Sequence, residues 1–330
     1  MKKTYMHLSL QERGLIHDMV WDKLSMSEIA RRISRDPSTI SRELNRNTPP
    51  LLKRYTPHLA QEHYEVRKQT VRQRPRLKNP KIVRYVRRKL KSGWSPEQIA
   101  GRWSKLHKKL TISHEAVYQY IYASTKPGEA GDLRVCLRRK HKRRQRKNIP
   151  FKEPRTTIPN RISIDLRPEE ISKRATYGHW EGDSMVSKKS KASLNTLTER
   201  KSRLVKISKL SRRTIEETNQ AVIAQLGAYP EILRRTITLD NGTENAGHEQ
   251  ITGRINLKCF FAHPYHSWER GTNENTNGLI RHYFPKGTDF ATVSEEDIKW
   301  VENLLNNRPR KCLGYLTPNE VFNKAVALSC

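Results

Sequence analysis

Along the first 47 residues, apolar positions recur every three or four residues, which is the period of an amphipathic helix. The pattern predicts three short helices, over residues 8–20, 25–34 and 36–47. Capping residues mark two of the starts, because Ser25 stands three residues before Glu28 and Asp36 is followed by Pro37. The second and third helices are joined by a short connection, so they are predicted to form a helix-turn-helix.

The third of these helices is the candidate reader of DNA. Ile40 and Leu44 are predicted to face inward, which leaves a polar face free for base edges and phosphates. The candidate DNA contacts on that face are Ser38, Thr39, Ser41, Arg42, Asn45 and Arg46. An ordinary helical bundle with a solvated polar face would show the same pattern, and the uneven charge of the chain favours DNA binding.

A second unit follows about 70 residues later. Residues 95–104 align without gaps on residues 25–34 with five identities in ten, and Ser95, Pro96 and Gln98 provide an N-terminal cap. This repeat predicts a second helix-turn-helix. Its last helix contributes His114 and Tyr118 as candidate DNA contacts.

From about residue 162 the pattern becomes that of an α/β domain. A strand is predicted around residues 177–186, and amphipathic or polar-faced helices are predicted at 214–226, 273–283 and 295–305. Further β-rich runs cover residues 194–198, 204–210 and 236–239. The chain between the first and last of these strands is long enough to return a new strand beside the first.

Three acids in this half carry candidate chemistry. Asp240 closes the run at 236–239 and precedes an Asn-Gly turn, and Asp183 follows a glycine, so both are predicted at strand ends, where α/β sheets bind ligands. Glu274 shares a helical face with Asn277 and Arg281. Surface acids or helix caps are the alternative for each acid alone. Together they favour a site for two Mg²⁺ ions, which Mn²⁺ could replace, in phosphoryl transfer.

Charge is distributed unevenly. Residues 1–150 contain 37 Lys and Arg against 12 Asp and Glu, whereas residues 151–330 contain 28 against 21. The whole-chain net charge of +32 implies a polyanionic partner bound in a salt-dependent way. A membrane is a weaker alternative, because no long apolar segment or signal-peptide core is present. The four cysteines lack zinc spacing, which predicts reduced thiols in a cytoplasmic, nucleoid-associated protein.

A strongly basic run lies between the two halves. Nine of the 14 residues from Arg134 to Lys147 are basic, so the run is unsuited to a core and is expected to meet phosphate. Its candidate DNA contacts are Arg138, Arg139, Arg143 and Arg144. The predicted organisation begins with a helix-turn-helix domain (residues 1–50), a basic helical connector (51–90) and a second helix-turn-helix (91–125). A basic linker (126–160) then leads to a catalytic domain with a helical extension (161–330).

Three motifs in the catalytic half resemble one family. GHWEGD at residues 178–183, LDNGTE at 239–244 and HSWERGTNENTNGLIR at 266–281 are similar to bacterial insertion-sequence transposases of the group numbered thirty, within the DDE superfamily that includes retroviral integrases. The resemblance implies an RNase H-like fold and a catalytic, metal-binding triad of Asp183, Asp240 and Glu274. Arg281 matches the family's basic residue two helical turns after the Glu, and Arg270 is a further candidate DNA contact.

The resemblance also ranks the remaining candidates. Three other acids are expected to be structural or to face DNA rather than to bind metal: Asp165, Glu244 and Glu269. Trp180 and Trp268 are expected to anchor the core. His179 and His266 are expected to be structural histidines whose hydrogen bonds are satisfied.

The function that these observations favour is that of a DNA transposase. It would bind the terminal inverted repeats of its element, cut a strand, and join the exposed 3′ hydroxyl to target DNA, with two element ends implying at least a dimer. The resemblance implies a copy-out route through a circular intermediate. Two rivals remain open: a helix-turn-helix transcription regulator that does not cut, and an RNase H-like nuclease without strand transfer.

Overall fold

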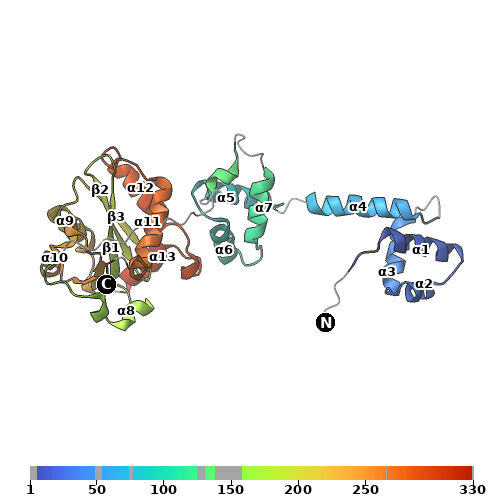
Figure 1. Cartoon of the computed structure of the whole chain (residues 1–330), viewed down its shortest axis with the longest axis horizontal. Helices are drawn as coiled ribbons and strands as arrows, with labels where there is room; N and C mark the ends of the chain where they lie inside the picture. Colours follow the sequence, from blue (N-terminus) through green and yellow to red (C-terminus); the bar gives the residue numbers. More distant parts are fainter. Residues whose placement is uncertain are drawn as a thin grey trace. The chain divides into compact units, whose positions relative to one another are not determined.

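The computed structural model describes residues 6–48, 54–73, 77–124, 131–137, 158–264 and 266–328 (Figure 1). The chain divides into two compact units, residues 1–76 and 77–330. In the part that the structure describes, every helix is too short or too polar to cross a lipid bilayer. The candidate DNA contacts Arg138, Arg139, Arg143 and Arg144 lie outside the described residues.

The N-terminal unit is a small helical bundle. Its helices are α1 (Leu10–Trp21), α2 (Met26–Arg32), α3 (Pro37–Asn47) and α4 (Pro57–Gln73). The expected caps are present, since the backbone N–H groups of Glu28 and Ser38 donate to the side chains of Ser25 and Asp36. Ile40 is fully buried in the core. The tight, capped α2–α3 pair therefore forms as the sequence predicts.

Two expectations for this unit need revision. The apolar residues Leu10, Leu15 and Val20 of α1 are exposed, so the side of α1 that faces the core is narrower than the apolar pattern suggested. The expected connector at residues 51–90 is divided between two bundles. Helix α4 packs on α1 and α3, with Tyr55 and Ala60 in the same core, because these apolar positions outweigh the basic composition of the segment.

The second bundle begins with α5 (Pro80–Lys91) and continues through α6 (Pro96–Leu106) and α7 (His114–Ser124). Ser95 and Gln98 form a complete capping box at the start of α6, with each side chain accepting the other residue's backbone N–H. Val117 and Ile121 of α7 are fully buried. The repeat detected in the sequence thus corresponds to a second three-helix unit.

The remainder of the chain contains a five-stranded mixed sheet in the order β3-β2-β1-β4-β5 (Figure 1). Its strands are β1 (His179–Val186), β2 (Ser193–Glu199), β3 (Val205–Leu210), β4 (Thr236–Leu239) and β5 (Lys258–Phe261). β1, β2 and β3 are antiparallel neighbours, whereas β4 and β5 run parallel to β1. This is the strand arrangement of an RNase H-like core, in agreement with the expected fold class.

Helices cover both faces of the sheet. One apolar core joins it to α9 (Ile215–Leu226), α10 (His248–Ile255) and α13 (Pro318–Ala327). A second core joins the opposite face to α11 (Gly271–Tyr283) and α12 (Glu295–Asn306). Figure 1 shows α9 and α10 on the other side of the sheet from α11 and α12. The candidate acids therefore lie where β1, β4 and α11 meet.

Candidate active site

The register of two parallel strands brings Asp183 and Asp240 together. Glu181 of β1 pairs with Thr238 of β4, and two residues further along each chain are Asp183 and Asp240. β1 extends beyond β4, so Asp183 lies within its strand rather than at the strand's end, which differs from the sequence expectation. The two carboxylates nevertheless meet at one edge of the sheet.

Gly182 is the residue that permits this close packing. A Cβ atom at this position would lie 2.6 Å from a methyl group of Leu239 and 3.2 Å from one of Ile237. Any side chain here would push β1 away from β4 or displace the core beneath. The glycine that precedes Asp183 therefore has a packing role next to the acid.

The turn after β4 fixes the carboxylate of Asp240. The backbone N–H of Gly242 donates to Oδ1 of Asp240 at 3.1 Å, and the side-chain amide of Asn245 donates to the same oxygen at 2.8 Å. The Asn-Gly pair thus forms the expected turn. Oδ2 of Asp240 accepts a hydrogen bond from Nη2 of Arg270 at 3.4 Å.

A positive group bridges the two acids. Arg270 places Nη1 3.2 Å from Oδ1 of Asp183 and Nη2 3.4 Å from Oδ2 of Asp240, and Nη1 also donates to the carbonyl of Gly182. Burial raises the pKa of Asp183, the charge of Asp240 adds to that rise, and Arg270 opposes it. Two hard carboxylate donors that require a positive charge between them are a suitable donor set for Mg²⁺ or Mn²⁺.

Helix α11 supplies the third side of the site. The side-chain N–H of Asn277 donates to Oδ2 of Asp183 at 2.6 Å. The hydroxyl of Thr196 donates to Oδ1 of Asn277 at 3.2 Å. Glu274 is exposed and lies one helical turn before Asn277. Within the described residues, its carboxylate does not form one group with those of Asp183 and Asp240 in which all ligand atoms lie within 4.8 Å of one another. The three expected acids thus belong to β1, the turn after β4, and the first half of α11.

Arg281 is held at the other end of α11. Its guanidinium donates to the carbonyl of Pro285 at 3.4 Å and lies 5.7 Å from the centre of the Phe290 ring, and burial lowers its pKa. Arg270, which the sequence suggested only as a DNA contact, is the arginine that touches the acids. The two candidate arginines therefore occupy different ends of the helix.

Sequence reasoning missed a buried acid behind the site. Glu181 is completely buried, and its Oε2 accepts the backbone N–H of Asn273 at 3.0 Å while its Oε1 lies 3.3 Å from Nε of Arg200. Glu181 therefore links β1 to the first turn of α11, which carries Glu274. In the sequence, Glu181 alternates with the polar residues His179 and Asp183, so the local pattern gave no signal that it is buried.

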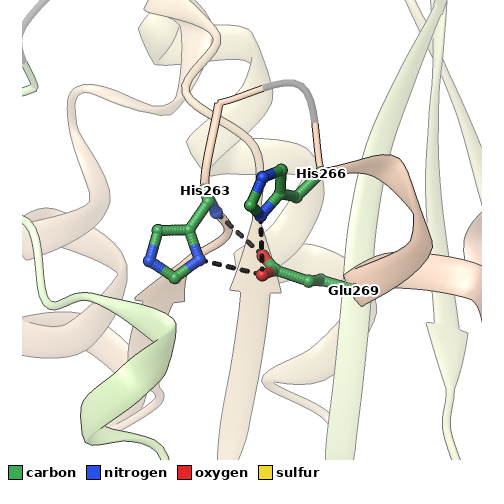
Figure 2. A group of neighbouring side chains, drawn as sticks. All are labelled: His263, His266 and Glu269. Carbon is green, nitrogen blue, oxygen red and sulfur yellow. Dashed lines mark hydrogen bonds and ion pairs between the residues drawn. The ribbon is translucent and has the colours of Figure 1, made fainter.

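The other three acids have separate partners. Glu244 is buried with Arg213 3.6 Å away. Asp165 contacts His263. Glu269 contacts both His263 and His266 (Figure 2). The pKa of His263 is raised, chiefly by its hydrogen bond to Glu269.

The aromatic and histidine expectations are met only in part. Trp180 is fully buried, and its indole donates to the carbonyl of Leu233, as expected of a core anchor. Trp268 is 68% exposed, so the expectation that it anchors the core is wrong, because residue type alone does not show which side of the turn faces solvent. His179 is a structural residue whose ring lies between two threonine hydroxyls, and burial lowers its pKa to about 4.

The candidate DNA contacts of the two bundles differ in exposure. On α3, four of the six candidates are exposed, namely Ser38, Arg42, Asn45 and Arg46. The other two, Thr39 and Ser41, are half-buried. On α7, His114 is exposed, while Tyr118 is half-buried and stacks on Tyr122 with ring centres 6.4 Å apart. The polar face of α3 is therefore open to a ligand along its length.

Comparison with known proteins found a sequence-family model and a solved structure that each match part of the chain. A sequence-family model described as a helix-turn-helix domain matches residues 4–47. The chain is also similar in structure to the catalytic core domain of BIV integrase, with a TM-score of 0.37 and 17% identity, over 46% of this chain and 97% of that one.

Curated relatives extend over nearly the whole chain. The transposase for insertion sequence element IS4351 of Bacteroides fragilis is 41% identical, covering 97% of this chain and 96% of that protein. Transposase InsI for element IS30A of Escherichia coli K12 is 37% identical, covering 99% and 86% respectively. The transposase for element IS1086 of Cupriavidus metallidurans is 33% identical, covering 99% and 97%. The chain therefore belongs to the IS30 family of insertion-sequence transposases.

Proposed function

We propose that this transposase cuts and joins DNA at the site formed by Asp183, Asp240 and Glu274. The observation that supports the proposal is the register of β1 and β4, together with the guanidinium of Arg270, which contacts the carboxylates of both Asp183 and Asp240. Such a site suits divalent cations, and when bound these would activate the attacking oxygen and stabilise the leaving oxygen in an in-line displacement at phosphorus.

The protein's own groups have distinct parts in this proposal. Asp183 and Asp240 would hold the cations from the sheet, and Glu274 would complete the site from α11. Asn277 keeps Asp183 oriented through its 2.6 Å hydrogen bond. Arg270, whose guanidinium already lies between the acids, is placed to take a phosphate oxygen of the bound strand once its carboxylate partners are neutralised.

Two displacements of the same kind account for transposition. In the first, water attacks phosphorus at the element end and the 3′ oxygen leaves, which exposes a 3′ hydroxyl. In the second, that hydroxyl attacks a phosphodiester of the target, so that one P–O bond forms as another breaks. The α2–α3 unit would deliver the terminal inverted repeats, and two ends require at least two protein copies.

Asp183→Asn tests the assignment. Cleavage of a duplex that carries the element's own end should fall by at least about 10²-fold, because a charged group aimed at the reacting centre is lost. End binding should be unchanged. Glu296→Gln, at an exposed acid in the first turn of α12, is the matched control and should cleave normally. Full cleavage by Asp183→Asn contradicts the assignment.

The products separate the rival functions. Ends joined to target DNA support the transposase, nicked ends alone support a nuclease, and binding without cleavage supports a regulator. We further infer a copy-out route through a circle. Cells that express the protein should then contain a junction in which the two element ends abut, and Asp183→Asn should remove it. Excised linear element without that junction contradicts the copy-out route.

A further inference from the structure

One turn outside the acid site gathers three metal-ligating groups. His263, His266 and Glu269 lie between β5 and α11, and their ligand atoms all fall within 4.8 Å of one another (Figure 2). The Nδ1 atoms of His263 and His266 lie 2.8 and 3.2 Å from the same atom, Oε1 of Glu269. We propose that these three side chains bind a divalent transition metal of the zinc class. This inference does not rest on the proposed function.

The donor set distinguishes this site from the acid site. Two imidazoles and one carboxylate form a three-ligand zinc set that leaves the fourth tetrahedral position open. Mg²⁺ prefers oxygen donors throughout, so it is expected at the acid site and not here. Tetrahedral bonds of about 2.0–2.2 Å place ligand atoms about 3.4 Å apart. The two Nδ1–Oε1 separations, 2.8 and 3.2 Å, would therefore need to open by about 0.6 and 0.2 Å.

A histidine that binds a metal through one ring nitrogen usually hydrogen-bonds to a carboxylate or carbonyl through the other, and His263 has such a partner. Its Nε2 lies 2.9 Å from Oδ2 of Asp165, and the hydroxyl of Ser163 donates to that same carboxylate oxygen at 2.7 Å. A carboxylate on the far ring nitrogen fixes the orientation and protonation of the imidazole and strengthens it as a ligand. Nδ1 of His263 is thereby directed toward Glu269.

The other two ligands are also held in place by contacts outside the cluster. Oε2 of Glu269 accepts the backbone N–H of His263 at 2.9 Å, which leaves Oε1 as the oxygen that faces both imidazoles. The ring of His266 stacks on Trp268, with centres 4.3 Å apart and planes inclined by 27°. All three ligands are therefore oriented before a metal binds, which lowers the entropy lost on binding.

The position of the cluster gives it a structural consequence. Glu269 is followed directly by Arg270, the residue that bridges Asp183 and Asp240. Asp165, which holds His263, comes from a segment more than 90 residues earlier. A metal at this turn would tie these segments together and fix the base of Arg270 beside the acid site.

The test uses untagged full-length protein that carries Asp183→Asn and Asp240→Asn, so that the acid site no longer contributes metal ligands. Titration with Co²⁺ should show one ion per chain and the visible absorption of tetrahedral cobalt with nitrogen and oxygen ligands. Zn²⁺ should displace the cobalt, and excess Mg²⁺ should not.

Single substitutions in this background should give a graded loss of affinity. His266→Ala and Glu269→Gln should each abolish the tetrahedral spectrum, and the isosteric Gln keeps the turn folded if the Ala does not. Asp165→Asn should weaken Co²⁺ binding by about 10- to 100-fold, the usual effect of losing an outer partner. His63→Ala, at an exposed histidine of α4, is the control and should bind normally.

Three results would each overturn the proposal. They are the absence of stoichiometric Co²⁺ binding, binding that is equally strong in His266→Ala and Glu269→Gln, and thiolate-to-cobalt charge-transfer bands, which would assign the metal to cysteines instead.

Discussion

Among the residues that the structure describes, the N-terminal unit and the catalytic sheet each contain one buried Arg–Glu pair, and the two pairs are built differently. In the N-terminal unit, Nε of Arg13 lies 2.7 Å from Glu43, and Nη1 of Arg13 donates to a backbone carbonyl and a glutamine side chain as well. In the sheet, Nε of Arg200 lies 3.3 Å from Glu181. Within the described residues, Nε and Nη1 of Arg200 are buried without a hydrogen-bond partner.

This difference shows two uses of a buried charge. Arg13 and Glu43 join α1 to α3 with good hydrogen-bond geometry, which stabilises the helix that carries the candidate DNA contacts. The pKa of Arg200 is lowered to about 10, chiefly by burial; Glu181 opposes the fall and neighbouring arginines contribute to it. Incompletely satisfied charges are retained where they serve a site. Here Glu181 positions the first turn of α11.

Breaking the better-satisfied pair should have the largest effect on stability. Arg13→Met leaves Glu43 buried without its charge partner, and the N-terminal unit should lose about 3–5 kcal/mol of unfolding free energy together with end binding. Chemical denaturation followed by circular dichroism measures the loss. Arg31→Ala, which removes an exposed ion pair with Glu28, is the control and should unfold like the parent protein. An Arg13→Met protein of unchanged stability would show that the two pairs do not differ as described.

Glu181→Gln should have a smaller effect on stability and a different functional consequence. The amide keeps an oxygen for the N–H of Asn273 but loses the charge beside Arg200, for an expected cost of about 1–3 kcal/mol. DNA cleavage should fall while end binding by the N-terminal unit is retained. Equal loss of cleavage and of binding would contradict a positioning role confined to the catalytic half.

Arg42→Ala is expected to have the smallest effect of the three substitutions, and it tests DNA binding rather than stability. Affinity for the element end should fall by about 1–3 kcal/mol, roughly 5- to 150-fold, because an exposed arginine of the recognition helix is lost. Affinity for random duplex should fall less. Equal loss on both DNAs in a binding assay at fixed salt would show that Arg42 contacts only phosphate.

Much of this fold is predictable because its signals are local. Caps and helical periodicity predicted the α2–α3 pair and the repeat at Ser95. The sequence also predicted the strands β1 to β4, but not β5 (Lys258–Phe261). The assignment of α4 to a connector failed because two apolar residues, Tyr55 and Ala60, decide where that basic helix packs. In the sequence, the basic composition of residues 51–90 hid the importance of these two apolar positions.

The acid site was predictable only in outline. Turn chemistry indicated Asp240, and helical spacing placed Asn277 on the face of Glu274. The bridge by Arg270 and the pairing of Glu181 with Arg200 depend on contacts between residues far apart in sequence. The same is true of the turn at His263: the sequence predicted a structural role for His266 and a structural or DNA-facing role for Glu269, and it assigned no role to His263. No local pattern encodes those contacts.

The most direct test of the account is an assay of metal-dependent cutting and joining. Purified protein and its Asp240→Asn variant are incubated with a labelled duplex carrying the element's own end, in Mg²⁺ and in EDTA. The account predicts cut and joined products from the parent protein in Mg²⁺ alone. Tight binding of verified end DNA without cleavage, or equal cleavage by Asp240→Asn, would contradict it.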